Sequence, residues 1–180
     1  MLPVTRFLKA ANVRLELIGG RLDAIDPEKD RAAELRRLKG EVVEELIDLF
    51  ASVDNSTDPS ITDPHVSNRA QYANDFRNRS KQPGTAWENG LAIPHVRTQQ
   101  ARYLALVFAR SRAGVWYDAP DGKPSHLFFG ISAPSWDKEW FQPFYSWIGR
   151  LFTRYAEWLP ESLLAAETAD DIVKLLATLD

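Results

Sequence analysis

The sequence predicts a three-layer α/β fold, in which helices cover both faces of a β-sheet. Two short runs at 103–109 and 127–133 are rich in strand-forming residues and almost entirely apolar, as is typical of strands buried on both faces. Helical patterns of apolar residues precede and follow these runs. Because helices and apolar strands interleave, a layered α/β architecture is favoured over a helical bundle.

Composition limits the classes of protein to consider. A chain of 180 residues can bury a substantial core as one domain without disulfides or metals. The net charge is −3 and basic residues are mixed with acidic ones, so there is no footprint for nucleic acid. The absence of cysteine excludes a thiolate site and fits a reducing cytoplasm. No apolar run approaches the roughly 20 residues that cross a bilayer, and the N-terminus lacks a signal-peptide core. We therefore expect a cytoplasmic protein with no membrane insertion.

The first elements are a strand and a long helix. Residues 12–17 alternate apolar and polar side chains, which predicts a strand that the glycines at 19–20 end. The pair Asp26–Pro27 has the pattern of an N-cap followed by the first helical residue. Apolar residues then recur at spacings of three and four as far as position 50, which predicts one face of a helix. Gly40 inside it costs about 1 kcal/mol relative to alanine.

The middle of the chain contains a polar loop, a second helix and turn segments. Residues 54–64 are predicted to form the loop, and Asp63–Pro64 to begin a helix that carries Phe76 on its apolar side. A basic, glycine-bearing segment at 77–90 is irregular. Residues 117–124, between the two apolar runs, have the composition of a turn.

The C-terminal third is predicted to be helical. Apolar and aromatic residues from Trp140 to Phe152 fit one helix face, with Pro143 in the first turn or at a kink. Thr168 and Asp171 have the spacing of a capping box that begins the last helix. Six tryptophans are unusual for this length, and indole packing in a core is the simplest explanation.

Two of the three histidines are expected to be structural. His65 directly follows the predicted helix start at Asp63–Pro64, where we expect a solvated side chain with little functional weight. His126 stands at the beginning of the second apolar run, where a hydrogen bond at a strand end is the simpler expectation.

His95 is the candidate for chemistry because of the residues before it in NGLAIPHVRT (89–98). Pro94 has a fixed φ and biases Ile93 toward an extended conformation, so the backbone that leads to the imidazole is stiff. A neutral imidazole can accept a phosphoryl group and release it again.

Arg79, Thr85 and Arg97 are near His95 in the sequence, and guanidinium and hydroxyl groups suit a phosphate dianion. From these residues alone, a turn histidine beside a surface arginine is still the better-supported interpretation.

Other chemistries find little support in the motifs. Three widely separated histidines without HExxH or cysteine do not have the spacing of metal ligands. There is no G-x-S-x-G elbow for a serine hydrolase, and no glycine-rich loop of the P-loop or dinucleotide type.

The segment RSKQPGTAWENGLAIPHVRT (79–98) resembles the active-site segment of the fructose/mannitol-type enzyme IIA domains of the bacterial phosphotransferase system, a group that includes a nitrogen-regulatory branch. The family pattern is R-E-x-x-x-S-T-G-I-G-N-G-I-A-I-P-H-G. Arg79 falls on its arginine, Thr85 on its threonine and His95 on its histidine, without a gap.

The resemblance is collinear over almost the whole chain. FLKAANVRLEL resembles the opening segment of the family, EVVEELIDLF its first long helix, VWYDAPDGKPSHLFFGISAP its turn and apolar strand, and TADDIVKLLATLD its last helix. Relative to the family, the chain has an insertion around 20–30.

This resemblance implies a mannitol-type enzyme IIA-like fold, a mixed sheet flanked by helices, with residues 1–180 as a single domain. It implies that His95 accepts a phosphoryl group from the histidine phosphocarrier protein and needs no cofactor. His95 would then pass the group to a sugar-permease B domain, or hold it as a regulatory mark through which this chain acts on a regulatory target protein. By position, Arg79 and Thr85 would hold the phosphate.

The sequence departs from the family pattern around the site. Sugar-transporting members have a second histidine near the start of the helix after the A-P strand, where this chain has Trp140 or Phe141. Val96 replaces a glycine, and Trp87 and Glu88 replace aliphatic and small residues. A carboxylate at Glu88 would repel a phosphohistidine unless it orients the imidazole. The missing histidine favours regulation over sugar uptake.

Further candidates and alternatives complete the expectations. His126 could replace the missing histidine, although we do not expect it. A non-catalytic interaction module with a tryptophan-rich surface is the alternative function, and a hydrolase with His95 as general base is a third. The candidates for residues around the phosphate site are Glu88, Asn89, Arg97 and His126; those for the tryptophan-rich surface are Trp136, Trp140 and Trp147.

Overall fold

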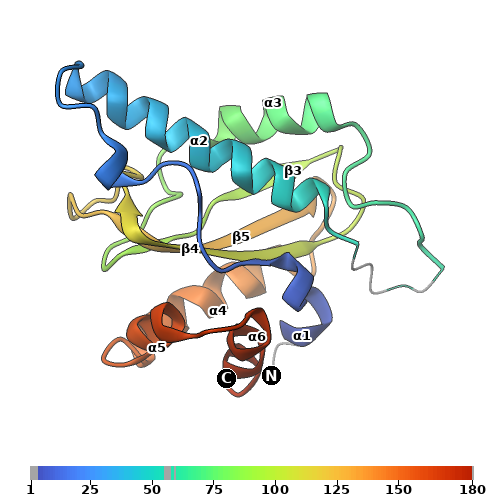
Figure 1. The fold of residues 1–180 in the computed structure, drawn as a ribbon. Coiled ribbons are helices and arrows are strands. Elements are labelled where there is room, and N and C mark those ends of the chain that lie inside the picture. The colour runs from blue at the N-terminus through green and yellow to red at the C-terminus, as the bar shows by residue number, and fades with distance from the viewer. Residues whose placement is uncertain (1–3, 55–57, 59, 180) are drawn as a thin grey trace.

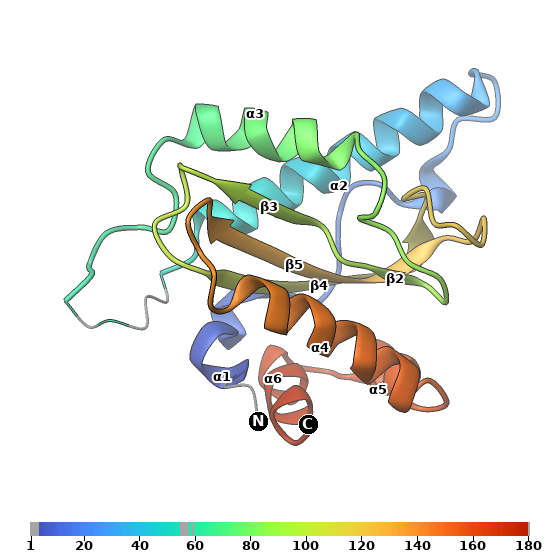
Figure 2. The same ribbon diagram turned by 180° about the vertical axis from the view of Figure 1, so that it is seen from behind.

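A five-stranded mixed sheet lies between two layers of helices in the computed structural model, which describes residues 4–54, 58 and 60–179 (Figures 1 and 2). The strand order is β1-β4-β5-β2, and β3 also pairs with β5. Among the pairs of named strands in the described residues, only β4–β5 is antiparallel. The predicted three-layer fold with a mixed sheet is therefore confirmed. The strands are β1 (Val13–Arg14), β2 (Leu91–Ala92), β3 (His95–Thr98), β4 (Ala105–Val115) and β5 (Ser125–Pro134).

The helices divide between the two faces of the sheet. Figures 1 and 2 show α2 and α3 on one face and α1, α4, α5 and α6 on the other. Short 3-10 turns at Ala10–Asn12 and Leu22–Ala24 complete the N-terminal part. The helices are α1 (Val4–Phe7), α2 (Arg31–Ala51), α3 (Arg69–Ser80), α4 (Phe141–Arg154), α5 (Leu159–Ala165) and α6 (Ala169–Ala177).

The central strands supply both hydrophobic cores. Successive side chains of a strand point to opposite faces, so in β4 Val107 packs with α2 and α3, whereas Leu106 and Phe108 pack with α4 to α6. All three are buried. This double burial explains why the runs at 103–109 and 127–133 are apolar almost throughout.

The edge strand of the sheet is interrupted at a proline. Both β2 and β3 pair in parallel with β5, and Leu91 lies opposite Leu127 and His95 opposite Ile131. Between them, the Pro94 carbonyl accepts a hydrogen bond from the Ile131 amide at 3.0 Å. Because proline has no N–H to donate, it is confined to sheet edges and interruptions such as this one.

The long helix α2 begins at Arg31, so the predicted start at Asp26–Pro27 is wrong. Asp30 is the N-cap, and its side chain accepts a hydrogen bond from the Ala33 amide at 2.7 Å. Asp26 instead closes a turn, since its side chain accepts from the Glu28 amide at 3.0 Å. An Asp-Pro pair suits a turn as well as a helix start.

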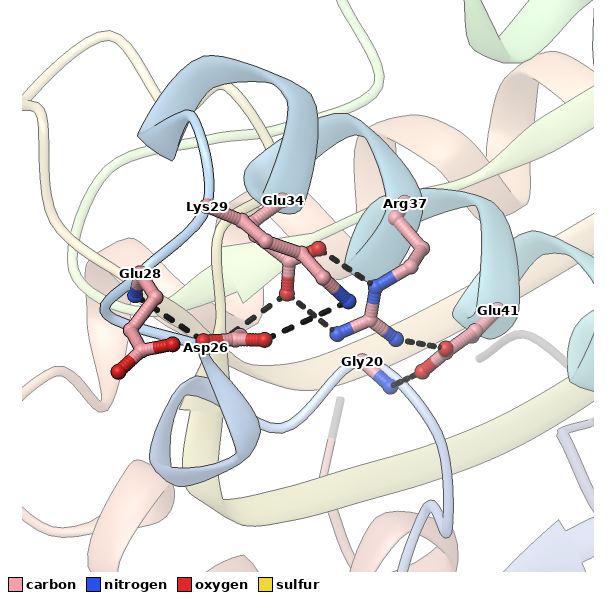
Figure 3. Close-up of polar contacts among 7 residues, drawn as sticks. All are labelled: Gly20, Asp26, Glu28, Lys29, Glu34, Arg37 and Glu41. Carbon is pink, nitrogen blue, oxygen red and sulfur yellow. Dashed lines mark hydrogen bonds and ion pairs between the residues drawn. The ribbon is translucent and has the colours of Figure 1, made fainter.

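The inserted segment at 20–30 folds onto the first turns of α2 (Figure 3). Buried Glu34 accepts from the Asp26 amide at 3.3 Å and pairs with Arg37 at 2.7 Å. Glu41 also pairs with Arg37 and accepts from the Gly20 amide at 2.9 Å. Carboxylates of α2 thus hold the start of the insertion at Gly20 and its middle at Asp26.

Helix α3 begins at Arg69 with Asn68 as its N-cap, so the predicted start at Asp63–Pro64 is also wrong. His65 consequently lies in the core with no exposed surface, not in a solvated first turn. Its Nε2 lies 2.7 Å from the Ser132 hydroxyl, and burial lowers its pKa to about 3. Part of the predicted loop at 54–64, residues 55–57 and 59, lies outside the described residues.

The C-terminal predictions agree with the structure, with additions. Pro143 lies in the first turn of α4, and Thr168 and Asp171 form the predicted capping box of α6. The short helices α1 and α5 were not predicted, because helices of this length leave little periodicity in the sequence. The N-terminal strand is shorter than residues 12–17. Among the described helices, none has the length and apolar character to cross a membrane.

The tryptophans suggested as a partner surface do not share one exposed face. Trp147 is buried in the core beneath α4, and Trp140 packs against Phe7 with ring centroids 5.3 Å apart. Trp136 is exposed. The prediction of a tryptophan-rich surface, on which the alternative function rested, is therefore wrong.

Candidate functional site

His95, the first residue of β3, lies between the two helical layers. Arg79, in the last turn of α3, approaches the imidazole from one side, and its Nη2 is 2.7 Å from the His95 Nε2. Phe141 and Tyr145, one turn apart on α4, contact the ring edge to face, with centroids at 5.6 Å and 5.2 Å. The half-buried imidazole thus has a cation at one nitrogen and aromatic rings around it.

The contacts of His95 fix its tautomer. Nδ1 lies 2.8 Å from the Ile93 carbonyl oxygen, which can only accept a hydrogen bond, so Nδ1 carries the proton. The Arg79 guanidinium can only donate, so Nε2 presents its lone pair. The interruption at Pro94 leaves the Ile93 carbonyl outside the sheet ladder and available to the imidazole.

The surroundings also keep the imidazole neutral. Burial lowers the pKa of His95 from its ordinary value of 6.5, the positive charge of Arg79 lowers it further, and the bond to the Ile93 carbonyl acts in the opposite direction. A pKa below 6.5 means that the ring is mostly unprotonated at pH 7. The site therefore contains a neutral nucleophile beside a guanidinium that suits phosphate.

The segment before β2 is held close to this pair. Arg79 donates from Nη1 to the Pro83 carbonyl at 3.2 Å. Thr85 is buried, and its carbonyl accepts from the Ile93 amide at 2.8 Å. Within the described chain, no hydrogen bond joins the Thr85 hydroxyl to His95 or Arg79. The structure thus places the backbone of Thr85 beside Ile93, two residues before His95.

Glu88 and Asn89 shape the turn that leads into β2. Asn89 has a φ of 60°, and its amide donates to the Asp121 carboxylate at 3.0 Å. Glu88 is exposed, and its carbonyl accepts from the Leu91 amide at 3.4 Å. These residues connect the turn at 117–124 to β2, and the structure does not place their side chains on His95.

Arg97 reaches the surroundings of His95 indirectly. Its Nη2 donates to the backbone carbonyls of Ser135, at 2.9 Å, and Asp137. Its guanidinium lies 5.5 Å from the centroid of Phe141, which contacts the imidazole. Arg97 therefore fixes the β5–α4 connection from which Phe141 projects.

His126 lies far along β5 from the candidate site. The residue opposite His95 in β5 is Ile131, and the separation of five positions from Ile131 to His126 corresponds to roughly 16 Å of strand. The His126 Nδ1 bonds instead to the Ser111 carbonyl at 2.9 Å. The resemblance places a second histidine at the position of Trp140 or Phe141. Of these two residues, Phe141 is the one that contacts His95.

Sequence reasoning missed Tyr145. Its ring is as close to His95 as that of Phe141. The signal was present in the spacing, because residues four apart on a helix share a face. Nothing in the composition of the segment, however, indicated which aromatic residues of α4 face the imidazole and which face the core.

The fold is shared with solved enzyme IIA structures. Nitrogen regulatory protein IIA-Ntr from Neisseria meningitidis superposes with a TM-score of 0.66 at 21% identity, covering 96% of this chain and 98% of that one. The mannitol IIA structure from Escherichia coli gives a TM-score of 0.53 at 17% identity, covering 94% and 98%. The fold is therefore that of the IIA class of phosphotransferase-system proteins.

Sequence comparison places the chain in a particular family of that class. Residues 38–178 match the family described as phosphoenolpyruvate-dependent sugar phosphotransferase system, EIIA 2. The chain belongs to this family, which confirms the resemblance inferred from its motif.

Two curated relatives match in sequence. The fructose-specific EIIABC component of Bacillus subtilis is 33% identical over 111 residues, which are 62% of this chain and 17% of that protein. The fructose-specific EIIA component of Haloferax volcanii is 34% identical over 88 residues, 49% of this chain and 56% of that protein. The chain thus spans less than two thirds of the length of either relative.

Proposed function

We propose that this protein is a phosphohistidine carrier of the phosphotransferase system, which accepts a phosphoryl group on Nε2 of His95. The supporting observation is the pair of contacts that leaves Nδ1 protonated toward the Ile93 carbonyl and Nε2 unprotonated toward Arg79. Membership of the EIIA 2 family supplies the reaction class.

The transfer uses the groups at the site as follows. The Nε2 lone pair forms the new N–P bond while the P–N bond of the donor phosphohistidine breaks. Nδ1 keeps its proton, so positive charge develops on the ring, where the Ile93 carbonyl dipole stabilises it. As the lone pair engages phosphorus, the Arg79 N–H leaves Nε2 and donates instead to the phosphoryl oxygens, whose charge it stabilises. Thr85, whose backbone lies beside Ile93, is assigned to help hold the phosphate.

The proposed donor is the histidine phosphocarrier protein, and both proteins would act in the cytoplasm. One acceptor is a cysteine of a sugar-permease B domain, and a structural neighbour at a TM-score of 0.53 is described as a complex of enzyme IIA and phosphorylated enzyme IIB for mannitol from Escherichia coli. Phe141 stands where a second imidazole would assist transfer of the phosphoryl group to an acceptor. We therefore favour a regulatory role, in which the phosphate on His95 marks this protein for a regulatory target protein.

Labelling of the purified protein tests this function. Incubation with phosphoenolpyruvate, enzyme I and the phosphocarrier should yield phosphate that is labile in acid and stable in base. The His95→Ala variant should not be labelled. Failure of the wild type under conditions that label a typical family member would overturn the proposal, and labelling of His95→Ala would show that another residue accepts the group.

A further inference from the structure

Tyr145 on α4 holds the segment before β2 with its hydroxyl group. The hydroxyl donates to the Gly84 carbonyl, at an O–O distance of 3.3 Å, and accepts from the Trp87 Nε1 at 3.2 Å. We call these three residues the Tyr145 clasp. One phenol thereby joins two ends of the segment 84–87 to a helix from the opposite layer.

The backbone of α4 is shaped to receive this clasp. The Trp87 ring lies over Gly149, and a Cβ atom at Gly149 would be only 2.5 Å from the Trp87 Cη2. The Tyr145 and Trp87 rings meet edge to face at 5.7 Å. A glycine at 149 therefore allows the indole to approach α4 closely enough to reach the Tyr145 hydroxyl.

Arg79 holds the same segment from the other side. It donates from Nη1 to the Pro83 carbonyl at 3.2 Å, next to Gly84, and from Nη2 to the His95 Nε2 at 2.7 Å. Tyr145 itself contacts the imidazole at 5.2 Å. The two side chains that secure residues 83–87 are thus the same ones that contact the proposed phospho-acceptor.

We propose that Tyr145 is a positioning residue for phosphoryl transfer, which keeps Gly84 and Trp87 in place so that Arg79 stays aligned with His95. The inference rests on the function proposed for His95. Its physical basis is that charge-stabilising groups act in transfer only when they are held in place beforehand. The Tyr145 ring also covers one side of the imidazole, with ring centroids 5.2 Å apart.

Removal of the clasp hydrogen bonds tests this role. We would phosphorylate the wild type, Tyr145→Phe and Trp87→Phe with phosphoramidate, a small donor that needs no partner protein. Tyr145→Phe keeps the ring and loses only the hydroxyl, whereas Trp87→Phe keeps a smaller aromatic ring and loses the Nε1 donor. Each should be phosphorylated about tenfold more slowly. The double variant should be no slower than the slower single one, because both changes break the same unit. Tyr155→Phe, which alters a tyrosine near the C-terminal end of α4, should match the wild type.

The pH dependence separates positioning from a general loss of stability. The ionisable groups that contact the His95 ring are Arg79 from α3 and Tyr145 from α4. If the loosened segment admits water, the His95 pKa should rise toward its ordinary value, and the acid limb of the rate profile should move to higher pH in both clasp variants. Destabilisation of the fold alone would not move it.

The outcomes distinguish the two proposals. If wild type is labelled on His95 but Tyr145→Phe and Trp87→Phe keep the wild-type rate and pH profile, the positioning role is overturned and the proposed function stands. The positioning role would also be overturned if the two substitutions slowed phosphorylation independently, so that their effects multiplied in the double variant, and if the pH profile stayed unchanged. If phosphoramidate labels His95→Ala as fast as it labels the wild type, His95 is not the acceptor and the function proposed for it fails.

Discussion

At the scale of single residues, the chemical state of His95 is set by one carbonyl and one guanidinium. The sequence motif predicted that Arg79 and His95 belong to one site, and the structure brings them together across 16 residues at 2.7 Å. The motif could not predict which nitrogen carries the proton, because that depends on the Ile93 carbonyl, a backbone group that every residue possesses.

The role of Arg79 can be tested by a substitution that keeps the charge. In Arg79→Lys, a single ammonium cannot contact both Pro83 and the imidazole as the planar guanidinium does. We expect the phosphorylation rate of His95 to fall by roughly 10- to 100-fold, measured with phosphoramidate. Arg69→Lys, at the other end of α3, should leave the rate unchanged. Equal loss in both variants would contradict a specific role.

The buried His65 makes folding stability depend on pH. Its pKa is lowered from 6.5 to about 3 in the folded protein, mainly by burial. The unfolded chain therefore binds a proton between these values while the folded protein does not, so the contribution is complete above pH 6.5 and declines as the pH falls toward 3. We expect this histidine to reduce the free energy of unfolding by about 2 kcal/mol between pH 7 and pH 5.

Urea denaturation at the two pH values measures this effect. His65→Gln keeps an amide that can bond to the Ser132 hydroxyl but does not titrate in this range. The pH dependence of the variant should be smaller than that of the wild type by the contribution of His65. An unchanged dependence would show that other groups cause it.

At the scale of secondary-structure elements, prediction succeeded for helix faces and failed for two helix starts. Both errors came from an Asp-Pro pair, at 26–27 and 63–64. In each case an aspartate or asparagine a few residues later, Asp30 or Asn68, accepts the capping hydrogen bond. Local sequence could not choose between the candidates, because the choice depends on how the preceding segment packs against the sheet.

Helix α2 contains a position where stability can be gained. Gly40 lies in its interior, and a Cβ atom there would have no heavy atom within 4 Å. Gly40→Ala should therefore raise the free energy of unfolding by about 1 kcal/mol through helix propensity, measured by urea denaturation. Gly20→Ala is the contrasting control, since its Cβ would lie 2.1 Å from the Val42 side chain at a φ of +73°. A loss of stability in Gly40→Ala would contradict the open environment.

At the scale of the whole molecule, a buried arginine connects elements that are distant in the sequence. Arg110 of β4 is 2% exposed. It donates from Nη1 to the carbonyls of Leu163 and Ala166, at 2.8 and 2.7 Å, and from Nε to that of Leu15. The C-terminal end of α5 and the segment after β1 are thus fixed to the centre of the sheet by one side chain.

Replacement of this arginine should affect stability and leave the site intact. Arg110→Met leaves one buried and two partly buried carbonyls without their donor, so we expect a loss of about 3 kcal/mol in the free energy of unfolding. Thermal and urea denaturation measure this loss, and labelling of His95 in the folded variant should be unchanged. Arg112→Met, an exposed neighbour on the same strand, should cost less than about 1 kcal/mol. Similar losses in the two variants would argue against the connection.

The collinear motifs predicted the family and the layered fold, because both depend on patterns that persist along the chain. They did not predict the short helices α1 and α5 or the depth of His65. These features depend on contacts between distant segments, such as those of Arg110 with α5 and of His65 with Ser132.

The interrupted edge strand also limits how a strand of another chain could pair with the sheet. A long, regular edge offers a row of unpaired amides and carbonyls to which another chain can add a strand. Here one edge is the two-residue β1, and the other is split by Pro94 into β2 and β3. The same proline that frees a carbonyl for the imidazole also removes a donor from the edge. The interruption at Pro94, which lets the Ile93 carbonyl bond to His95, thereby also shortens the edge to which a strand of another chain could add.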